Sequence, residues 1–182
     1  MDCKINTESN GIVRLVQMER ELLHLYFKGF ENDPDIFMDM SRFKEFCYSP
    51  EWVDAYYRKQ MDDAVPPFPR RYPFMIMMDA TPIGELYLKR VDYQKQECVL
   101  SIHLQNDSVK NKGYGTAAER LALDYAFNTL GMNTVLADCI HKNIRSRHVL
   151  EKLGFEYMAQ DESFRYYRYS RQAWDLQKPY AY

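Results

Sequence analysis

The amino-acid sequence predicts a mixed α/β layer fold, in which helices cover a central β-sheet. Strand-like runs rich in β-branched and aromatic residues alternate with segments whose apolar residues recur at helical spacing. The predicted element order is β-α-α-β-β-β-α-β-α-β-β. Of the 182 residues, 46% are hydrophobic, and a chain of this length buries enough surface for a core without disulfide or metal staples. We therefore predict a single domain over residues 1–182.

The N-terminal part is predicted to hold one strand and two helices. Residues 11–17 alternate partly between apolar and polar side chains, which indicates a strand. Helical spacing over residues 22–30 predicts a helix that ends before Pro34, because the residue preceding proline avoids helical angles. A second helix is predicted over residues 50–62, and the proline-rich segment 66–69 is a stiff connector.

The rest of the chain is predicted to form three strands, a polar loop, a long amphipathic helix, a β-branched strand, a short helix and a closing hairpin. The predicted ranges are 72–78, 83–91 and 97–104 for the three strands, 134–140 for the next strand, 146–153 for the short helix, and 155–158 and 164–174 for the hairpin. The long helix follows Gly115, carries its apolar face over residues 118–130 and ends at Gly131.

Composition excludes several functional classes. Lys and Arg number 24 against 26 Asp and Glu, and the net charge is -2, whereas general nucleic-acid or membrane-surface binders are usually strongly basic. No run approaches the about 18 apolar residues of a membrane span. The start of the chain, residues 1–7, lacks the basic-then-apolar order of a secretory signal. We expect neither nucleic acid nor a membrane as a partner.

The cysteines are far apart in the sequence and form no C-x-x-C pair. They are Cys3, Cys47, Cys98 and Cys139. This spacing argues against a disulfide framework and favours a reducing, cytoplasmic location. Cys139, His141 and His148 have no fourth ligand at a familiar zinc spacing, so we expect no bound metal.

A glycine-containing segment lies between the third of these strands and the long helix. The first turn of a helix has N–H groups without helical partners and carries the positive end of the helix dipole. Gly113 and Gly115 let the backbone turn sharply and approach a ligand, while Lys110 and Lys112 add positive charge. These features predict a phosphate or pyrophosphate site. A tight loop with two solvated lysines explains the same residues without a ligand.

Two other patterns overlap this segment. Residues 116–119, Thr-Ala-Ala-Glu, fit a capping box. The string Gly113-x-Gly115-x-x-Ala118 satisfies the dinucleotide-binding fingerprint, and Asp138 stands near the place of the ribose-binding acid. That fingerprint needs its first glycine directly after a strand, whereas residues 105–112 intervene here. A nucleotide-dependent oxidoreductase fragment is therefore the less favoured alternative, and no P-loop spacing is present.

A second motif follows the next predicted strand: Asn143-x-x-Ser146-x-x-x-Leu150-Glu151-Lys152-Leu153-Gly154-Phe155. Together with Lys110-x-x-Gly113-x-Gly115, it resembles the GNAT superfamily of N-acetyltransferases, and most closely the RimJ/RimL-like branch. The resemblance extends over nearly the whole chain. It implies a GNAT-like mixed central sheet flanked by helices, with acetyl-CoA as the cosubstrate.

The resemblance also implies how the cofactor is held. The loop backbone binds the coenzyme A pyrophosphate. The loop consists of Lys110, Asn111, Lys112, Gly113, Tyr114, Gly115 and Thr116. The preceding strand splays from its neighbour, which places Ile102, His103 and Leu104 beside the pantetheine arm. Asn143 matches the family asparagine near the thioester, and a helix N-cap is its alternative role.

The implied reaction is direct attack of an amine on the acetyl thioester. A protonated amine is not a nucleophile, so a base must remove a proton, and backbone N–H groups must stabilise the oxyanion. Relatives often carry a glutamate in the strand before the loop. Here Glu97 is the nearest carboxylate and our candidate base, with an edge or turn position as the alternative. His103 has a suitable ordinary pKa, or is a half-buried strand residue.

The proton donor for the departing thiolate is poorly matched. Many relatives have a tyrosine near the cofactor sulfur, where this chain has Leu150. Ser146 aligns with a serine proposed for this role in the RimL-like branch, and its alternative role is to start a helix. We therefore expect an N-acetyltransferase, while a non-catalytic acyl-CoA-binding or interaction module of the same fold stays open.

The acceptor is expected to be a small-molecule or peptide amine. An acidic run follows the first helix, in a region that often walls the acceptor site in GNAT-like folds. It consists of Glu31, Asp33, Asp35 and Asp39, and a solvated loop is its other interpretation. Homodimers are common among relatives, so a homodimer is an assembly that the resemblance allows.

Overall fold

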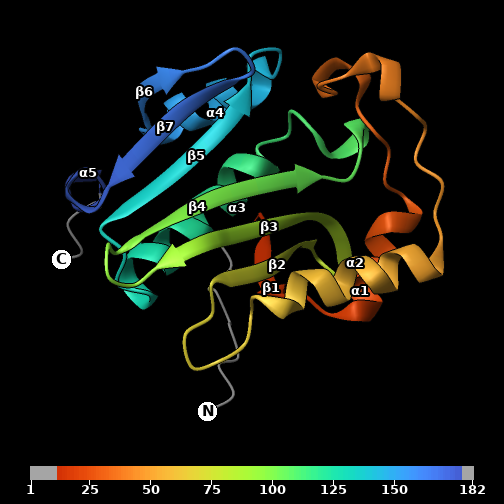
Figure 1. Cartoon of the computed structure of the whole chain (residues 1–182), viewed down its shortest axis with the longest axis horizontal. Coiled ribbons are helices and arrows are strands. Elements are labelled where there is room, and N and C mark those ends of the chain that lie inside the picture. The colour runs from red at the N-terminus through yellow and green to blue at the C-terminus, as the bar shows by residue number, and fades with distance from the viewer. Residues whose placement is uncertain (1–11, 178–182) are drawn as a thin grey trace.

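The computed structural model describes residues 12–177 (Figure 1). Gly11, where the first strand was expected to start, and residues 1–7 lie outside this range. The strands are β1 (Arg14–Gln17), β2 (Arg71–Met78), β3 (Thr81–Asp92), β4 (Glu97–Leu104), β5 (Thr134–Ile140), β6 (Glu156–Gln160) and β7 (Phe164–Ser170). The helices are α1 (Arg20–Lys28), α2 (Pro50–Asp62), α3 (Tyr114–Asp124), α4 (Ile144–Leu153) and α5 (Arg171–Gln177).

The seven strands form one mixed sheet in the order β1-β2-β3-β4-β5-β7-β6. All neighbours pair antiparallel except β4 and β5, which are parallel. The predicted fold class, a mixed sheet flanked by helices, is confirmed. A dinucleotide-binding domain has a mostly parallel, doubly wound sheet, so a single parallel pair within residues 12–177 rules out that alternative.

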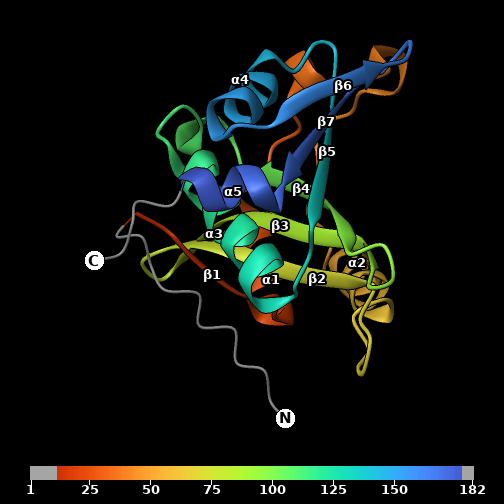
Figure 2. The same cartoon turned by 90° about the vertical axis from the view of Figure 1, so that its left-hand side faces the viewer.

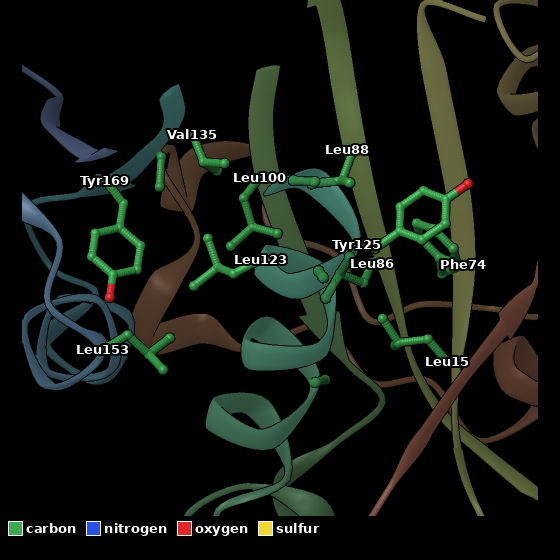
Figure 3. Packing of buried hydrophobic residues seen from close by; sticks show 14 of the residues in the cluster. Leu15, Phe74, Leu86, Leu88, Leu100, Leu123, Tyr125, Val135, Leu153 and Tyr169 are labelled. Atoms are coloured by element: carbon green, nitrogen blue, oxygen red, sulfur yellow. The ribbon is translucent and has the colours of Figure 1, made fainter. Parts of the chain in front are cut away.

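The sheet separates two cores, because successive strand side chains point to opposite faces. Leu86, Leu88 and Leu100 belong to the larger core, which packs around α3 (Figure 3). The opposite face carries a smaller core, in which Met75 and Tyr87 join apolar residues of α1 and α2. In the side view, α3 and α5 lie on one side of the sheet and α2 on the other (Figure 2).

The long helix differs from its prediction mainly in form. It starts at Tyr114, within the glycine segment that was expected to precede it, and continues after Asp124 as a π-helical turn, η4 (Tyr125–Thr129). Ala118 and Ala122 are completely buried against the sheet, and their small side chains let the helix lie close to the strands. This contact fixes the start of α3 next to β4.

The closing hairpin was predicted to run to Trp174, and that prediction is wrong. Strand β7 ends at Ser170, whose hydroxyl oxygen accepts a hydrogen bond from the Ala173 N–H at 3.2 Å and starts α5. The helix brings Trp174 into a stacked contact with Phe127, with 5.6 Å between ring centroids. Burial of the indole in the core therefore ends the strand at a point that the local sequence does not mark.

Candidate functional site

The parallel strands β4 and β5 pair along only part of their length. Their register runs from Glu97 opposite Thr134 to Leu100 opposite Ala137. Beyond that point, residues 101–104 pair with β3 and residues 138–140 with β7, and the two strands diverge (Figure 1). We call these two stretches the β4–β5 fork. The backbone groups that face into the fork are unused by the sheet and are available to a ligand.

The glycine loop lies at the open end of the fork. Gly113 is the N-cap of α3 and has φ +82°, a left-handed conformation that favours glycine. The first intrahelical bond runs from the Ala117 N–H to the Gly113 carbonyl at 3.0 Å. The N–H groups of residues 114–116 therefore precede the helical bonding pattern and have no partner within the helix.

The helix start also lies close to the fork strand. A Cβ atom added at Gly115 would contact the Cδ1 atoms of Leu104 at 3.8 Å and Ile102 at 3.9 Å. The loop that was assigned to the pyrophosphate and the strand that was assigned to the pantetheine arm thus form one continuous surface. Asn111 and Lys112 are exposed on the loop, and Asn111 has φ +59°.

The capping-box interpretation of residues 116–119 is wrong. Gly113, not Thr116, is the N-cap, and no side chain caps the helix. Glu119 is 2% exposed instead, and its Oε2 atom has no hydrogen-bond partner among the described residues. Burial raises the pKa of its carboxyl group to about 8.

Asn143 and Ser146 lie across the fork from the glycine loop, beyond the end of β5. Asn143 is the N-cap of α4, and its side-chain oxygen accepts a hydrogen bond from the Ser146 N–H at 3.0 Å. The N-cap role considered for Asn143 is confirmed. Leu150, in the place of the family tyrosine, is 2% exposed and packs in the larger core.

An ion-pair network joins the two sides of the fork. The Lys110 ammonium donates to Asp33 at 2.7 Å and to Asp107 at 2.9 Å, and Arg145 of α4 also binds Asp33. The side chains of Asp33 and Lys110 are 7% and 13% exposed. Asp33 is therefore not part of a solvated loop, and the charge of Lys110 is already compensated within the protein.

The pKa of Asp33 reflects this network. Burial opposes its ionisation, but the hydrogen bond from Lys110 and the charges of Lys110 and Arg145 outweigh that effect and lower the pKa. Asp33 is consequently a fixed anion. It ties the segment after α1 to the glycine loop and to the start of α4.

Glu97, the candidate base, lies at the paired end of β4. It is opposite Thr134 of β5, where the two strands are still hydrogen-bonded, and Lys95 is 3.8 Å from its carboxylate. The fork opens three positions later, after Leu100, toward the far end of the strand. The structure thus brings Ile102, His103 and Leu104 to the fork but does not bring Glu97 there.

A different carboxyl group lies beside the fork. Glu85 of β3 pairs with His103 of β4, and Tyr87 pairs with Ser101. The Glu85 carboxyl accepts hydrogen bonds from the Tyr87 hydroxyl at 2.6 Å and from the Tyr56 hydroxyl at 3.0 Å. The two hydroxyl oxygens are 3.0 Å apart. We call Tyr56, Glu85 and Tyr87 the tyrosine–carboxyl cluster.

Two members of the cluster, Glu85 and Tyr87, are shielded from water, and each is 4% exposed. Burial raises the pKa of Glu85 to about 7, while the two tyrosine hydroxyls and the charge of Arg71 offset only part of that rise. His103 is accessible, yet the protein around it and the nearby Lys89 lower its pKa.

The chain matches a known protein family over most of its length. Residues 13–156 match the family model described as an acetyltransferase (GNAT) domain. The chain belongs to the GNAT acetyltransferase family. Acetyl-CoA is the cosubstrate of this family. A curated relative, the uncharacterized N-acetyltransferase YnaD of Bacillus subtilis, is 35% identical over 49 residues, which cover 27% of this chain and 29% of the relative.

Solved GNAT structures share the fold at low sequence identity. A spermidine N-acetyltransferase from Vibrio cholerae, in complex with CoA and spermine, has a TM-score of 0.72 at 18% identity and covers 91% of this chain and 99% of its own. The microcin C7 self-immunity acetyltransferase MccE, in complex with acetyl-CoA and AMP, has a TM-score of 0.71 at 14% identity, with 90% and 94% covered.

Glu85 is not among the site residues that the sequence of this GNAT chain predicts. The available signal was one charged residue within the apolar run Ile83–Leu88, since a glutamate is rarely buried without a special environment. Its partner Tyr56 is 29 positions away on α2, so sequence spacing could not pair them.

Two surface hollows lie elsewhere on the protein. One is lined by residues around Ser170 and Leu176, and the other by residues of α1 together with Tyr48. Neither is lined by a residue of the fork or the glycine loop, and an open fork between two strands is not an enclosed cavity. Within residues 12–177, no helix is long and apolar enough to cross a membrane, and no three potential metal ligands cluster.

Proposed function

We propose that the chain is an acetyl-CoA-dependent N-acetyltransferase of the RimJ/RimL-like branch, with residues 1–182 as one acetyltransferase domain. Its acceptor is a small-molecule or peptide amine. The observation that carries this proposal is the opening of the β4–β5 fork directly beside the glycine-capped start of α3. The fork offers unused backbone groups to the pantetheine arm, and the positive N-terminal end of α3 beside it suits the negatively charged diphosphate of the cofactor.

The cofactor's diphosphate would bind the N–H groups of residues 114–116, with the exposed Lys112 supplying positive charge. Lys110 would act indirectly, because its ammonium is held by Asp33 and Asp107. The pantetheine arm would form backbone hydrogen bonds along residues 101–104, in the way that an added strand pairs with a sheet edge. Asn143 would flank the arm from the β5 side of the fork.

Binding of acetyl-CoA tests this placement by calorimetry, and Gly113→Glu is the critical variant. A Cβ at Gly113 would meet nothing within 4 Å, so the new side chain enters open space and brings a negative charge to the diphosphate site. We expect the affinity of this variant to fall at least about tenfold, which corresponds to about 1.4 kcal/mol.

The matched control is Gly113→Ala, which carries the same left-handed backbone strain without the charge. We expect the alanine variant to bind acetyl-CoA within about threefold of the wild type, which is less than about 1 kcal/mol. Equal affinities of the glutamate and alanine variants would mean that the diphosphate binds elsewhere. A wild-type protein that binds no acetyl-CoA at millimolar concentration would overturn the proposed function.

The second candidate is a non-catalytic acyl-CoA-binding module, which the buried Leu150 favours because it leaves the family's proton donor unmatched. Release of the CoA thiol separates the two functions. The solved neighbours suggest acceptors to test, since they include a spermidine N-acetyltransferase and FdhC, a nucleotide-linked sugar GNAT. An acetyltransferase releases thiol only when an amine is present, whereas a binding module releases none.

Compartment and assembly are also proposals. Cys47, Cys98 and Cys139 are free thiols in the described chain, which fits the reducing cytoplasm. The homodimer is supported only by the family resemblance, and one of the structural neighbours is dodecameric. Light scattering of the purified protein measures the assembly directly.

A further inference from the structure

We propose that the tyrosine–carboxyl cluster takes the proton from the acceptor amine, with Tyr56 as the group that meets the amine and Glu85 as the final proton acceptor. This inference rests on the proposed N-acetyltransferase function and assigns its missing base. Glu85 acts through Tyr56, so it is a positioning residue for the proton path and does not touch the substrate.

The position of the cluster follows from strand register. Tyr87 lies opposite Ser101, and Glu85 lies opposite His103. Both partners belong to the stretch of β4 directly after Leu100, where β4 no longer pairs with β5. Residues directly opposite each other on antiparallel strands share a face of the sheet. The cluster therefore lies beside the start of the fork, on the face that carries α1 and α2.

That face is also the one open to an acceptor. Ile102 and Leu104 point to the other face and pack against the core around α3. The accessible His103 shares the face of Glu85. An amine that reaches a thioester in the fork from this side passes the hydroxyl groups of the cluster.

Packing fixes the proton path. Tyr56 stacks on Trp52, with 5.2 Å between ring centroids, and meets the edge of Phe27 at 5.3 Å. Its partly buried ring places the hydroxyl 3.0 Å from one carboxyl oxygen of Glu85. The Tyr87 hydroxyl holds the second oxygen at 2.6 Å. Both carboxyl oxygens are thus oriented before substrate binds.

Charged and titratable groups surround Glu85 on every packed element. Tyr26 lies on α1, Tyr56 on α2, Arg71 on β2 and Tyr87 on β3 itself; His103 is the opposite residue on β4. Arg71 is the one cation in this set, and its guanidinium binds Gln60 at 2.6 Å rather than the carboxyl group. With no ion pair to fix its charge, Glu85 can gain and lose a proton near neutral pH.

The ammonium gives one proton to the Tyr56 oxygen while the Tyr56 hydroxyl proton moves to the Glu85 carboxylate. The nitrogen lone pair then forms the N–C bond with the thioester carbonyl carbon, and the C–S bond breaks with its electron pair on sulfur. A second amine proton passes to sulfur. The products are the acetamide, the CoA thiol and a protonated Glu85.

A matched pair of amines tests the proton path. Ethylamine is protonated at neutral pH, whereas 2,2,2-trifluoroethylamine has nearly the same shape and is already neutral. The experiment measures amine-dependent release of CoA thiol by the full-length protein from mildly acidic to mildly alkaline pH. Glu85→Gln and Tyr56→Phe are the variants, and Glu97→Gln is the carboxyl control.

For Glu85→Gln we expect an about 100-fold loss of the ethylamine rate at neutral pH, the range that a positioned base supplies. The rising limb of the pH profile near pH 7 should disappear. The trifluoroethylamine rate and the acetyl-CoA affinity should stay near wild type. Tyr56→Phe should show the same preference for the neutral amine, and Glu97→Gln should match the wild type.

Equal losses with both amines would show that Glu85 has only a structural role and would overturn the proposal. An unchanged ethylamine rate in folded Glu85→Gln would also overturn it. If Glu85→Gln fails to fold, Tyr56→Phe decides by the same comparison. A wild type that binds acetyl-CoA but acetylates neither amine refutes the proton path alone, whereas a wild type that binds no acetyl-CoA refutes the proposed function.

Discussion

Two buried acids near the fork, Asp33 and Glu85, have opposite electrostatic surroundings. Asp33 is bound by Lys110 and Arg145, and its pKa is lowered despite burial. Glu85 is bound by two tyrosine hydroxyls, and burial raises its pKa to about 7. The comparison teaches that a neighbouring cation, rather than burial, decides whether such a carboxyl is a fixed anion or a titrating group. Asp33 is suited to hold segments together and Glu85 to exchange a proton.

The largest expected effect is on the Asp33 side of this comparison. Lys110→Met removes one of the two cations that bind Asp33, and Arg145 remains, so the cost does not exceed the about 3 kcal/mol at which an unpaired buried charge begins. We therefore expect the free energy of unfolding in urea at pH 7 to fall by up to about 3 kcal/mol.

Lys112→Met is the control, because this lysine is exposed in the same loop and surface substitutions change stability by only about 0.5 kcal/mol. Similar losses for the two lysine variants would contradict the shielded ion pair.

The next prediction concerns the pH dependence of stability on the Glu85 side. The pKa of Glu85 in the folded protein is about 7, above the ordinary value of 4.5. The contribution of protonated Glu85 to folding stability is therefore lost as pH rises from the ordinary pKa through the folded pKa. Relative to Glu85→Gln, the wild type should lose about 2.5 kcal/mol of unfolding free energy between pH 5 and pH 8.

Parallel stability curves for the wild type and Glu85→Gln over that range would mean that Glu85 does not titrate there. Asp33 has the opposite sign, because its pKa is lowered. Its contribution should be lost only below its ordinary value of 3.8, as pH falls through the lowered pKa of the folded state, so Asp33→Asn should flatten the acid limb alone.

The smallest effect is expected at Glu119, a third buried acid with neither a cation nor a complete set of hydrogen bonds. Replacing it by methionine removes an unsatisfied polar atom and keeps a similar volume. We expect Glu119→Met to raise the free energy of unfolding in urea by about 1 kcal/mol at neutral pH. A destabilised variant would indicate that Glu119 has a partner that the isolated chain lacks.

The sequence predicted the parts of this molecule that depend on local pattern. The order of strands and helices along the chain up to β7, the glycine segment before the long helix and the N-cap role considered for Asn143 follow from residue spacing and capping chemistry. Strand 97–104 was predicted with its exact bounds. Glu97, the candidate base from the sequence, begins a strand whose opposite end reaches the fork.

The remaining features depend on contacts between distant segments. Lys110 meets Asp33 across 77 positions, and Tyr56 meets Glu85 across 29. Neither pair has a periodicity or spacing that a single sequence displays. The end of β7 likewise depends on the packing of Trp174 against Phe127. The charge states of these acids depend on tertiary partners, so the sequence pointed to Asp33 without its ion pairs and did not single out Glu85.

A crystal structure with coenzyme A tests the central claim most directly, namely that the cofactor lies in the β4–β5 fork with its reactive end beside the tyrosine–carboxyl cluster. We predict the diphosphate on the N–H groups of residues 114–116 and the sulfur alongside residues 101–103, facing Tyr56. A diphosphate bound away from Gly113, or a sulfur atom on the α3 side of the sheet, would contradict the account.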